Sequence, residues 1–492
     1  MPSSVVDVVV IGAGPAGAAA ARLLASWGRS VVIVGRSPSR RQLAESLPPS
    51  CAKLLERVGV RSAVDSAGFI RATGNTVKWA GGDTRAEFFD AGTYGYQVSR
   101  AEFDGVLLSA AENARATVYR DATVRDVERT ADDWSVAFDA GDARHTVSSR
   151  WVLDCSGRSG VVARRGWRKA ETSSRTTAVV GVWECPDAAV AHDPTHTLVE
   201  SYDGGWAWSV PVAGGRRYVT VMLDPSVTDV PGKARLSDAY RTELMRTSML
   251  RALVERCTLV ETPWGCDASP YTADHATGDG ALLVGDAASF VDPLSSFGVK
   301  KALASAWLAA VAVNTAIAEP AMTTHALALF EDRERAMYEH LQRQSAALSR
   351  EAAGVHASAF WVGRSDVALD ESFGEVDVAA LRSDDRVLGA FEALKGRPSI
   401  ALSASESLRV IERATVHGQR VVLERHLASP ALPRGIRYCR NIDLLIIAQI
   451  AARYDQVPDL FDAYNRQAPP APLPDFLGAL STLIGLGLLT LA

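Results

Sequence analysis

The chain lacks three features that would assign it to a familiar class: closely paired cysteines, a basic surplus and a long hydrophobic run. Six cysteines are scattered through 492 residues without any C-x-x-C pair: Cys51, Cys155, Cys185, Cys257, Cys266 and Cys439. This spacing predicts neither a structural zinc site nor a disulfide framework. We therefore expect no metal site, and a reducing, cytoplasmic location.

Charge and hydropathy argue against two kinds of partner. The net charge is -5, whereas nucleic-acid-binding proteins usually carry a basic surplus on one face. The apolar run Leu477–Ala492 is broken by Gly485 and Gly487, and it is shorter than the ~20 residues of a bilayer-spanning helix. The segment Val5–Ile11 has neither the basic start nor the cleavage site of a signal peptide. We expect no nucleic-acid partner and no membrane span.

The first residues carry a dinucleotide-binding pattern. Val5–Ile11 is predicted as a buried strand, because it is apolar and mostly β-branched and is followed by glycine. A GxGxxG motif then leads into a helix over Ala18–Trp27, and Ser30–Val34 is a second strand. The glycines permit a tight turn, close approach of a pyrophosphate, and close helix–strand packing. The helix N-terminus would face the phosphates. We assign these residues to cofactor binding: Gly12, Ala13, Gly14, Ala16 and Gly17.

The second strand departs from the usual dinucleotide pattern. An acidic residue is expected at its end to hold the adenosine ribose, but the chain reads Val34-Gly35-Arg36. Two alternatives remain for the ribose, namely Arg36 and water. The departure leaves the Rossmann-type fold prediction unchanged.

A second motif lies far along the chain, at residues 281–298. It reads ALLVGDAASFVDPLSSFG, a strand followed by Gly285-Asp286 and by a loop that enters a long helix. Here the chain resembles the FAD monooxygenase superfamily, in its branch of flavin-dependent halogenases and geranylgeranyl-reductase-like enzymes. The resemblance implies that Asp286 binds the ribityl chain of FAD. It also implies that Pro293 and the segment from Ser296 through Gly298 to Val299 lie beside the isoalloxazine ring. A simple helix N-cap is the alternative for Asp286.

Three shorter segments support the same resemblance, which extends over residues 5 to about 345. Glu45 and Ser46 begin a segment, ESLPP, that lies near the flavin in the family. Arg100 begins an R-x-x-F-D helix start, whose arginine reaches toward the FAD phosphates in the family. The turn Asp154–Arg158 matches a D-x-S-G-R pattern that we interpret as structural. Val124 completes the predicted set of cofactor contacts.

A β-rich region between Arg175 and Pro225 is predicted to roof the flavin and border the substrate. Its apolar runs are separated by Gly and Asp turns: Thr176–Glu184, Thr197–Tyr202, Trp206–Val212 and Tyr218–Leu223. Trp206 and Trp208 belong to a segment that resembles the WxWxIP motif of flavin-dependent halogenases. Their spacing places both on one face of the strand. They either contact the substrate or pack the sheet against the flavin domain.

Lysines bear on the choice between halogenation and other chemistry. The resemblance implies that a halogenase needs a lysine about thirty residues after its E-S-x-x-P segment, and Lys78 is the candidate. An ordinary strand lysine is the alternative. Halogenases of this branch carry a histidine after the loop glycine, where this chain has Val299-Lys300-Lys301. These two lysines either face an anionic substrate or form a solvated edge.

The C-terminal part is predicted to be mainly helical. Ala302–Ile317 and His325–Arg350 have the pattern of long amphipathic helices, and Ser399–Arg413 is predicted as a further helix. The last residues, with two helices, a third helix and a short strand, resemble a winged-helix module. Arg440–Ala492 contains three Arg, five Asp and no Lys, which is a poor DNA surface. Docking of a protein or peptide and a lid over the core are the alternatives.

The predicted fold is α/β with three parts. A Rossmann-type FAD-binding domain covers residues 1–170 and 265–350, an interleaved antiparallel β-sheet substrate domain covers 171–264, and a mainly helical, winged-helix-like domain covers 351–492.

The predicted function is that of an FAD-dependent monooxygenase that uses O2 to hydroxylate an electron-rich aromatic substrate, indole- or phenol-like. No second glycine fingerprint exists for NAD(P)H, so electrons would come from NAD(P)H directly or from a separate flavin reductase. The stretch FVDPLSSFGVKKA and the added domain resemble flavoproteins that mature tryptophylquinone enzymes, which implies a substrate presented on a peptide or carrier protein. A halogenase, a double-bond reductase and a non-catalytic flavin-bearing assembly factor are the alternatives.

Overall fold

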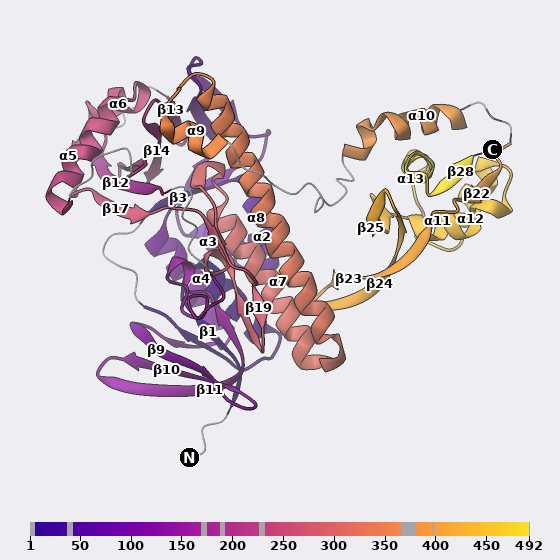
Figure 1. Cartoon of the computed structure of the whole chain (residues 1–492), viewed down its shortest axis with the longest axis horizontal. Helices are drawn as coiled ribbons and strands as arrows, with labels where there is room; N and C mark the ends of the chain where they lie inside the picture. The colour runs from indigo at the N-terminus through magenta and orange to yellow at the C-terminus, as the bar shows by residue number, and fades with distance from the viewer. Residues whose placement is uncertain are drawn as a thin grey trace. The chain divides into compact units, whose positions relative to one another are not determined.

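The computed structural model describes residues 5–36, 43–168, 175–186, 192–225, 232–365, 380–395, 397 and 399–491. The chain divides into two compact units, Met1–Leu369 and Asp370–Ala492 (Figure 1). Helix α9 (Ala359–Ser365) packs on α8 (Thr323–Ala353) within the first unit. The division therefore lies after the position 351 at which we expected the last domain to start. The expected boundary at 170/171 falls outside the described residues.

The first unit contains a mainly parallel sheet in the order β19-β20-β11-β1-β2-β8. The last four residues of β1 and all of β2 are buried, as their runs of Val and Ile require. β9 and β10 extend the sheet as an antiparallel hairpin next to β11. The strand bounds are β1 (Val6–Ile11), β2 (Val31–Val34), β8 (Thr117–Tyr119), β9 (Ala122–Arg129), β10 (Trp134–Ala140), β11 (Ala143–Asp154), β19 (Thr277–Gly278) and β20 (Ala281–Leu283).

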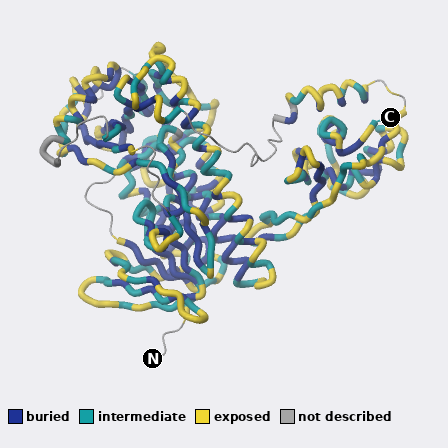
Figure 2. The backbone as a smooth tube through the Cα atoms, viewed as in Figure 1, coloured by how far each residue is buried: buried dark blue, intermediate teal, exposed yellow. Residues whose placement is uncertain are grey.

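Helices α1 (Pro15–Ser26), α4 (Arg100–Asn113) and α7 (Gly298–Ala318) pack together in this unit, and α8 lies beside α7 (Figure 1). The two long helices predicted at 302–317 and 325–350 are thus confirmed. Among the described residues, only α7 is long and apolar enough to cross a membrane by length and composition. Most of it is buried inside the unit, as expected of a core helix in a large fold (Figure 2).

A second, largely antiparallel sheet has the order β16-β12-β15-β14-β13-β5-β6, with β17 beside β12. The four strands predicted between Arg175 and Pro225 are all present. The sheet also takes in two strands from the N-terminal region, which the sequence did not reveal. The bounds are β5 (Gly74–Lys78), β6 (Arg85–Phe88), β12 (Thr177–Glu184), β13 (Thr197–Tyr202), β14 (Gly205–Val212), β15 (Arg216–Leu223), β16 (Thr258–Leu259) and β17 (Trp264–Asp267).

Helices α5 (Gly232–Met245) and α6 (Met249–Val254) pack on this second sheet. Cys185, after β12, and Cys257, after α6, form a disulfide with their Cα atoms 4.5 Å apart. The prediction of a chain without disulfides is therefore wrong for this pair. The two cysteines are 72 residues apart in the sequence, and only the folding of the sheet brings them together.

A small third sheet, β3-β7-β4, lies against β14 of the second sheet and contacts helices α4 and α7. It consists of β3 (Ala44–Leu47), β4 (Ile70–Ala72) and β7 (Gly95–Ser99), with α2 (Ala52–Val58) and α3 (Arg61–Ser66) nearby. β3 carries Glu45 and Ser46, and it pairs with β7, which runs directly into α4 at Arg100. This sheet therefore fixes three of the predicted cofactor residues near one another.

The second unit has its own core, formed mainly by three helices, α11 (Leu444–Ile450), α12 (Val457–Asn465) and α13 (Leu473–Gly485). The final strand β28 (Leu489–Leu491) pairs with β22 (Leu402–Ala404), which agrees with the predicted winged-helix-like arrangement. The helix predicted over Ser399–Arg413 is wrong. The β-branched residues of β23 (Arg409–His417) instead pair along the whole strand with β24 (Arg420–Ser429). The other elements are α10 (Asp385–Leu394), β25 (Leu432–Ile436), β26 (Tyr438–Cys439) and β27 (Ile442–Asp443).

Candidate functional site

The loops after β1, β11 and β20 meet at one edge of the parallel sheet, because all three strands run in the same direction. This edge is where ligands bind in open α/β sheets. Gly12 has φ +112°, and a Cβ there would lie 2.3 Å from the carbonyl oxygen of Cys155. A Cβ on Gly17 would lie 1.9 Å from the carbonyl oxygen of Gly12. Packing of the strand, turn and helix therefore requires glycine at both positions.

Gly14 differs from the other two glycines of the motif. A Cβ there would meet nothing closer than the guanidinium of Arg100, at 3.8 Å. Gly14 is also the N-cap of α1, and no side chain caps that helix end. The first N–H groups of the helix and its partial positive charge are consequently available to an anion.

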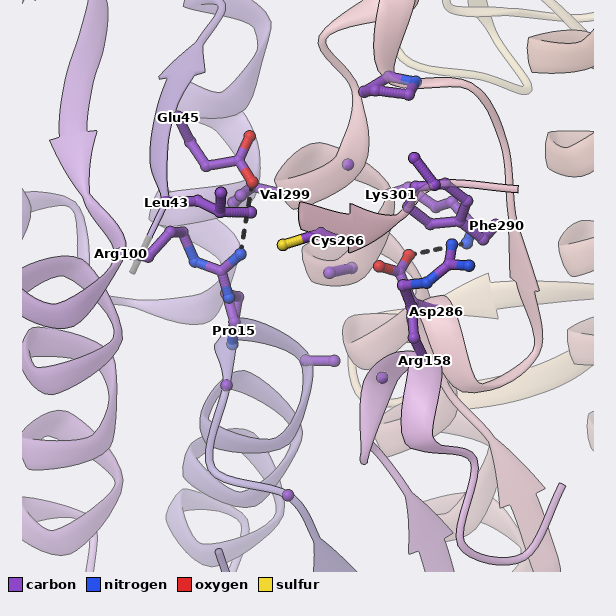
Figure 3. A pocket seen from close by; sticks show the side chains of 18 of the residues that line it. Pro15, Leu43, Glu45, Arg100, Arg158, Cys266, Asp286, Phe290, Val299 and Lys301 are labelled. Atoms are coloured by element: carbon purple, nitrogen blue, oxygen red, sulfur yellow. Dashed lines mark hydrogen bonds and ion pairs between the residues drawn. The ribbon is translucent and has the colours of Figure 1, made fainter. Parts of the chain in front are cut away.

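A single cavity of about 480 Å³ extends from this turn to the second sheet (Figure 3). Most of the predicted site residues line it. Gly17, Gly285 and Lys78 do not. The predicted residues that line the cavity are Gly12, Ala13, Gly14, Ala16, Arg36, Glu45, Ser46, Arg100, Val124, Trp206, Trp208, Asp286, Pro293, Ser296, Gly298 and Val299.

Arg100 dominates the charge at the glycine-rich end of the cavity. Its guanidinium donates to both carboxylate oxygens of Asp104, each at 3.0 Å, and its Nη1 lies 3.4 Å from Oε1 of Glu45 (Figure 3). Burial raises the pKa of Glu45, and the charge of Arg100 opposes that rise. Arg100 is therefore fixed by two carboxylates beside the open face of Gly14.

Asp286 lines the cavity from the turn Gly285–Ala287. Its backbone carbonyl accepts from the hydroxyl of Tyr271 at 2.5 Å. One carboxylate oxygen lies 3.3 Å from Nζ of Lys301. The N-cap position of this turn is Val284, so Asp286 does not occupy the capping position that was its alternative role. Gly285 has φ +65° and lies against Ala16 and Ala302.

Trp206 and Trp208 form an aromatic wall on the second sheet. Their rings are stacked, with centroids 4.6 Å apart and an interplanar angle of 24°. This confirms the prediction that both point to one face of the strand. Val180 and Cys266 line the same part of the cavity, and burial raises the pKa of the Cys266 thiol. This end of the cavity is therefore mostly apolar.

Asp292 is a residue that the sequence analysis missed. It lines the apolar end of the cavity next to Phe290 and Leu294, and the backbone N–H of Leu294 donates to its Oδ1 at 3.1 Å. Burial raises the pKa of Asp292 to about 6, opposed by this hydrogen bond and by the charge of Arg364. An Asp before Pro normally indicates only a local turn, so nothing in the sequence marked it as a titratable group in a cavity.

Lys78 does not line the cavity. It lies at the end of β5, and its Nζ donates to Oγ of Ser248 at 2.6 Å. Ser248 in turn donates to Glu200, whose carboxylate also accepts from the backbone N–H groups at the start of α6. The lysine thus belongs to a polar cluster at a helix N-terminus.

Arg36 is exposed and lines the cavity beyond β2. Both alternatives for the contact with the adenosine ribose, Arg36 and water, therefore remain.

A family model described as "FAD binding domain" matches residues 5–343. The chain is similar to the Tryptophan 2-halogenase of Chondromyces crocatus, with 30% identity over 332 residues, which cover 65% of this chain and 62% of the relative. It is also similar to the flavin-dependent halogenase armH1 of Armillaria mellea, with 28% identity over 353 residues, covering 64% of this chain and 66% of that relative. The chain thus spans less than two thirds of the length of these two relatives.

Solved structures with the same fold extend over both units. CmlS, a flavin-dependent halogenase, covers 99% of this chain and 96% of its own, with a TM-score of 0.78 and 21% identity. The peptidyl tryptophan dihydroxylase QhpG covers 99% of this chain and 100% of its own, with a TM-score of 0.70 and 22% identity. At these identities the likeness establishes the fold, including the Rossmann-type domain and the C-terminal unit.

Proposed function

The chain belongs to the FAD-binding domain family, and from this membership we propose that it is an FAD-dependent monooxygenase that hydroxylates an electron-rich, indole- or phenol-like ring. The observation that carries the proposal is the continuous cavity, which joins a dinucleotide-type glycine turn to an aromatic wall with a partly buried carboxylate, Asp292. Such a cavity can hold an extended cofactor at one end and an aromatic substrate at the other.

The residues present fit FAD. The open face of Gly14 and the uncapped N-terminus of α1 would receive the phosphates, with Arg100 beside them. Asp286 would hold the ribityl chain, and Arg36 or water the adenosine ribose. The remaining predicted cofactor contacts are Glu45, Ser46 and Val124, with Pro293, Ser296, Gly298 and Val299 beside the ring. Bound FAD would supply the reaction with O2, after reduction by NAD(P)H or by a separate flavin reductase.

The chain's own side chains would prepare the substrate. Trp206 and Trp208 offer an apolar wall that excludes water and orients an aromatic ring. Asp292, with its pKa near 6, is mostly ionised at neutral pH and can accept a proton from a phenol or indole group. Removing that proton makes the ring more electron-rich, which favours transfer of oxygen to it.

A flavin-dependent halogenase is the second candidate, and the similarity to the Tryptophan 2-halogenase favours it. The position of Lys78 gives this candidate little support, because Lys78 donates to Ser248 and does not line the cavity. Lys78 stays a prediction as a halogenation residue. If it has that role, Lys78→Met abolishes a halide-dependent product, whereas under our proposal the same variant retains hydroxylation.

Presentation of the substrate on a peptide or carrier protein is also part of the proposal. One relative is a brominase of a pyrrole group on a peptidyl carrier protein, from Pseudoalteromonas luteoviolacea, and one structural neighbour is a peptidyl tryptophan dihydroxylase. The second unit, with its own core, would dock the presenting protein. This role and a cytoplasmic location stay predictions.

Product analysis tests the proposal. The purified protein, a flavin reductase and NADH are incubated with indole- and phenol-type substrates, free and peptide-linked, in air, with and without chloride or bromide. We expect a mass gain of one oxygen that is independent of halide. A halogenated product formed only with halide would overturn the monooxygenase assignment in favour of the second candidate.

A further inference from the structure

Two adjacent lysines at the start of α7 have different surroundings. The side chain of Lys301 is only 3% exposed, whereas Lys300 is partly exposed and lies over the ring of Phe297, 4.5 Å from its centroid. The sequence indicated either a solvated edge or a contact with an anionic substrate for this pair. Lys301 is no solvated edge: its side chain is buried within the unit, and it lines the cavity together with Asp286.

The position of Lys301 is unfavourable for a cation unless it is compensated. A helix N-terminus carries a partial positive charge, which repels an ammonium in the first turn. Burial adds the cost of removing that ammonium from water. A lysine buried at this place therefore needs strong acceptors nearby.

The acceptors come from one short segment, the stretch Gly285–Ser289 that contains Asp286. Nζ of Lys301 donates to the carbonyl oxygen of Gly285 at 3.2 Å, to Oδ1 of Asp286 at 3.3 Å and to the carbonyl oxygen of Ser289. These three bonds use all three donors of an ammonium. Lys301 thereby links α7 to the turn that presents Asp286 to the cavity.

A second carboxylate increases the need for this cation. Glu334, on α8, is buried, and one of its carboxylate oxygens has no hydrogen-bond partner. Burial raises the pKa of Glu334 to about 7, and the charge of Lys301 opposes the rise. Lys301 is therefore the cation that interacts with both Asp286 and Glu334, and its loss would remove the ammonium that bonds to Asp286.

We propose that Lys301 is a positioning residue for the flavin: its ammonium holds the Asp286 carboxylate and the Gly285–Ser289 backbone in the arrangement that binds the cofactor. The side chain of Asp286 is 32% exposed, while that of Lys301 is 3% exposed. Both residues line the cavity, but the ammonium of Lys301 is engaged by three acceptors of the chain, so Asp286 presents the freer polar group to the ligand and Lys301 acts through it. This inference rests on the proposed function in one respect, namely that Asp286 contacts FAD.

Titration of the flavin-free protein with FAD tests the inference without any turnover. Binding is followed by the quenching of flavin fluorescence. Lys301→Met keeps most of the length of the side chain and removes its charge and donors, so we expect FAD affinity to fall by about 10- to 100-fold. The matched control is Lys300→Met, one residue away, which should bind FAD within about twofold of the parent, since that lysine makes no contact with Asp286.

A double-mutant cycle separates positioning from general damage. If Lys301 acts through Asp286, Lys301→Met should weaken FAD binding much less in an Asp286→Asn background than in the parent. Equal losses in both backgrounds, or FAD binding by Lys301→Met as tight as in the parent, would overturn the inference.

A second substitution checks that weaker FAD binding is not caused by misfolding. Lys301→Gln keeps two N–H donors for the carbonyls of Gly285 and Ser289 but carries no charge for Asp286. We expect it to retain the parent's far-ultraviolet circular dichroism and still to bind FAD more weakly. A Gln variant that binds as well as the parent would contradict the inference alone. Failure of the parent itself to bind FAD would contradict the proposed function, and the inference with it.

Discussion

At the scale of single residues, Asp292 has the features of a group that handles a proton. It lies at the apolar end of the cavity near Phe290 and Leu294, and burial raises its pKa to about 6. Perturbed carboxyl groups in cavities are frequent at catalytic sites. Gly14 shows a different kind of constraint, because space for the ligand, and not packing, explains its lack of a side chain.

The pH profile tests the role of Asp292. Only the ionised carboxylate accepts a proton, so kcat/KM should rise with pH through about 6 and level off above it. Asp292→Asn should lower kcat/KM by roughly 100-fold or more and abolish this limb. Asp224→Asn is a suitable control, since Asp224 also contacts Arg364 but does not line the cavity. An unchanged limb in Asp292→Asn would exclude Asp292 as the titrating group.

The glycine turn gives a prediction that separates binding from folding. Gly17→Ala places a methyl group 1.9 Å from the carbonyl oxygen of Gly12, so we expect a large loss of stability in the flavin-free protein. Gly14→Ala meets no protein atom closer than 3.8 Å, so the flavin-free protein should unfold at nearly the parent temperature and bind FAD weakly. Thermal unfolding without FAD and a FAD titration measure the two effects. Tight FAD binding by Gly14→Ala would contradict the assigned role of the turn.

At the scale of elements, sequence patterns predicted what is local and missed what is distant. The β1–turn–α1 unit and the strands β12 to β15 were predictable because periodicity and glycine spacing are encoded within a few residues. β5 joins the second sheet beside β13, far along the chain, and no local signal indicates such a pairing. The segment Ser399–Arg413 was mistaken for a helix because it contains β22 and the start of β23, whose partners, β28 and β24, lie later in the chain.

In the candidate site, too, the sequence predicted the residues of local motifs and missed properties that depend on the fold. Motifs identified the residues at the glycine turn and at Asp286, since backbone geometry leaves a sequence signature there. Asp292 carried no signature, and the sequence could not distinguish Lys301 from Lys300, because burial in the folded unit determines the properties of both sites. Cys185 and Cys257 illustrate the same point.

The disulfide between Cys185 and Cys257 leads to a prediction about the stability of the β12–α6 region. It closes a loop of 72 residues between β12 and α6, so Cys185→Ser should lower the free energy of unfolding by roughly 2–4 kcal/mol. Reduction should destabilise the parent protein but not this variant, as measured by denaturant unfolding with and without dithiothreitol. Thiol counting under denaturing conditions provides the control. Six titratable thiols in the freshly isolated parent would show that the pair is reduced, as a cytoplasmic location would favour.

At the scale of the whole molecule, our proposal assigns cofactor and ring binding to the first unit and docking of the presenting protein to the second. The described residues that line the cavity all belong to the first unit, which therefore holds the proposed sites of the flavin and of the aromatic ring. The second unit has a separate core built from α11, α12 and α13. Under our proposal this unit docks the protein that bears the substrate.

The most direct test of the account is to reduce the purified FAD-loaded protein without oxygen and then mix it with O2 and an aromatic substrate in a stopped-flow spectrophotometer. We predict an oxygenated flavin species whose decay is accelerated by substrate, is independent of chloride, and coincides with hydroxylated product. Reoxidation of the flavin that substrate does not affect, with turnover that proceeds equally well without oxygen, would contradict the monooxygenase assignment and favour a reductase.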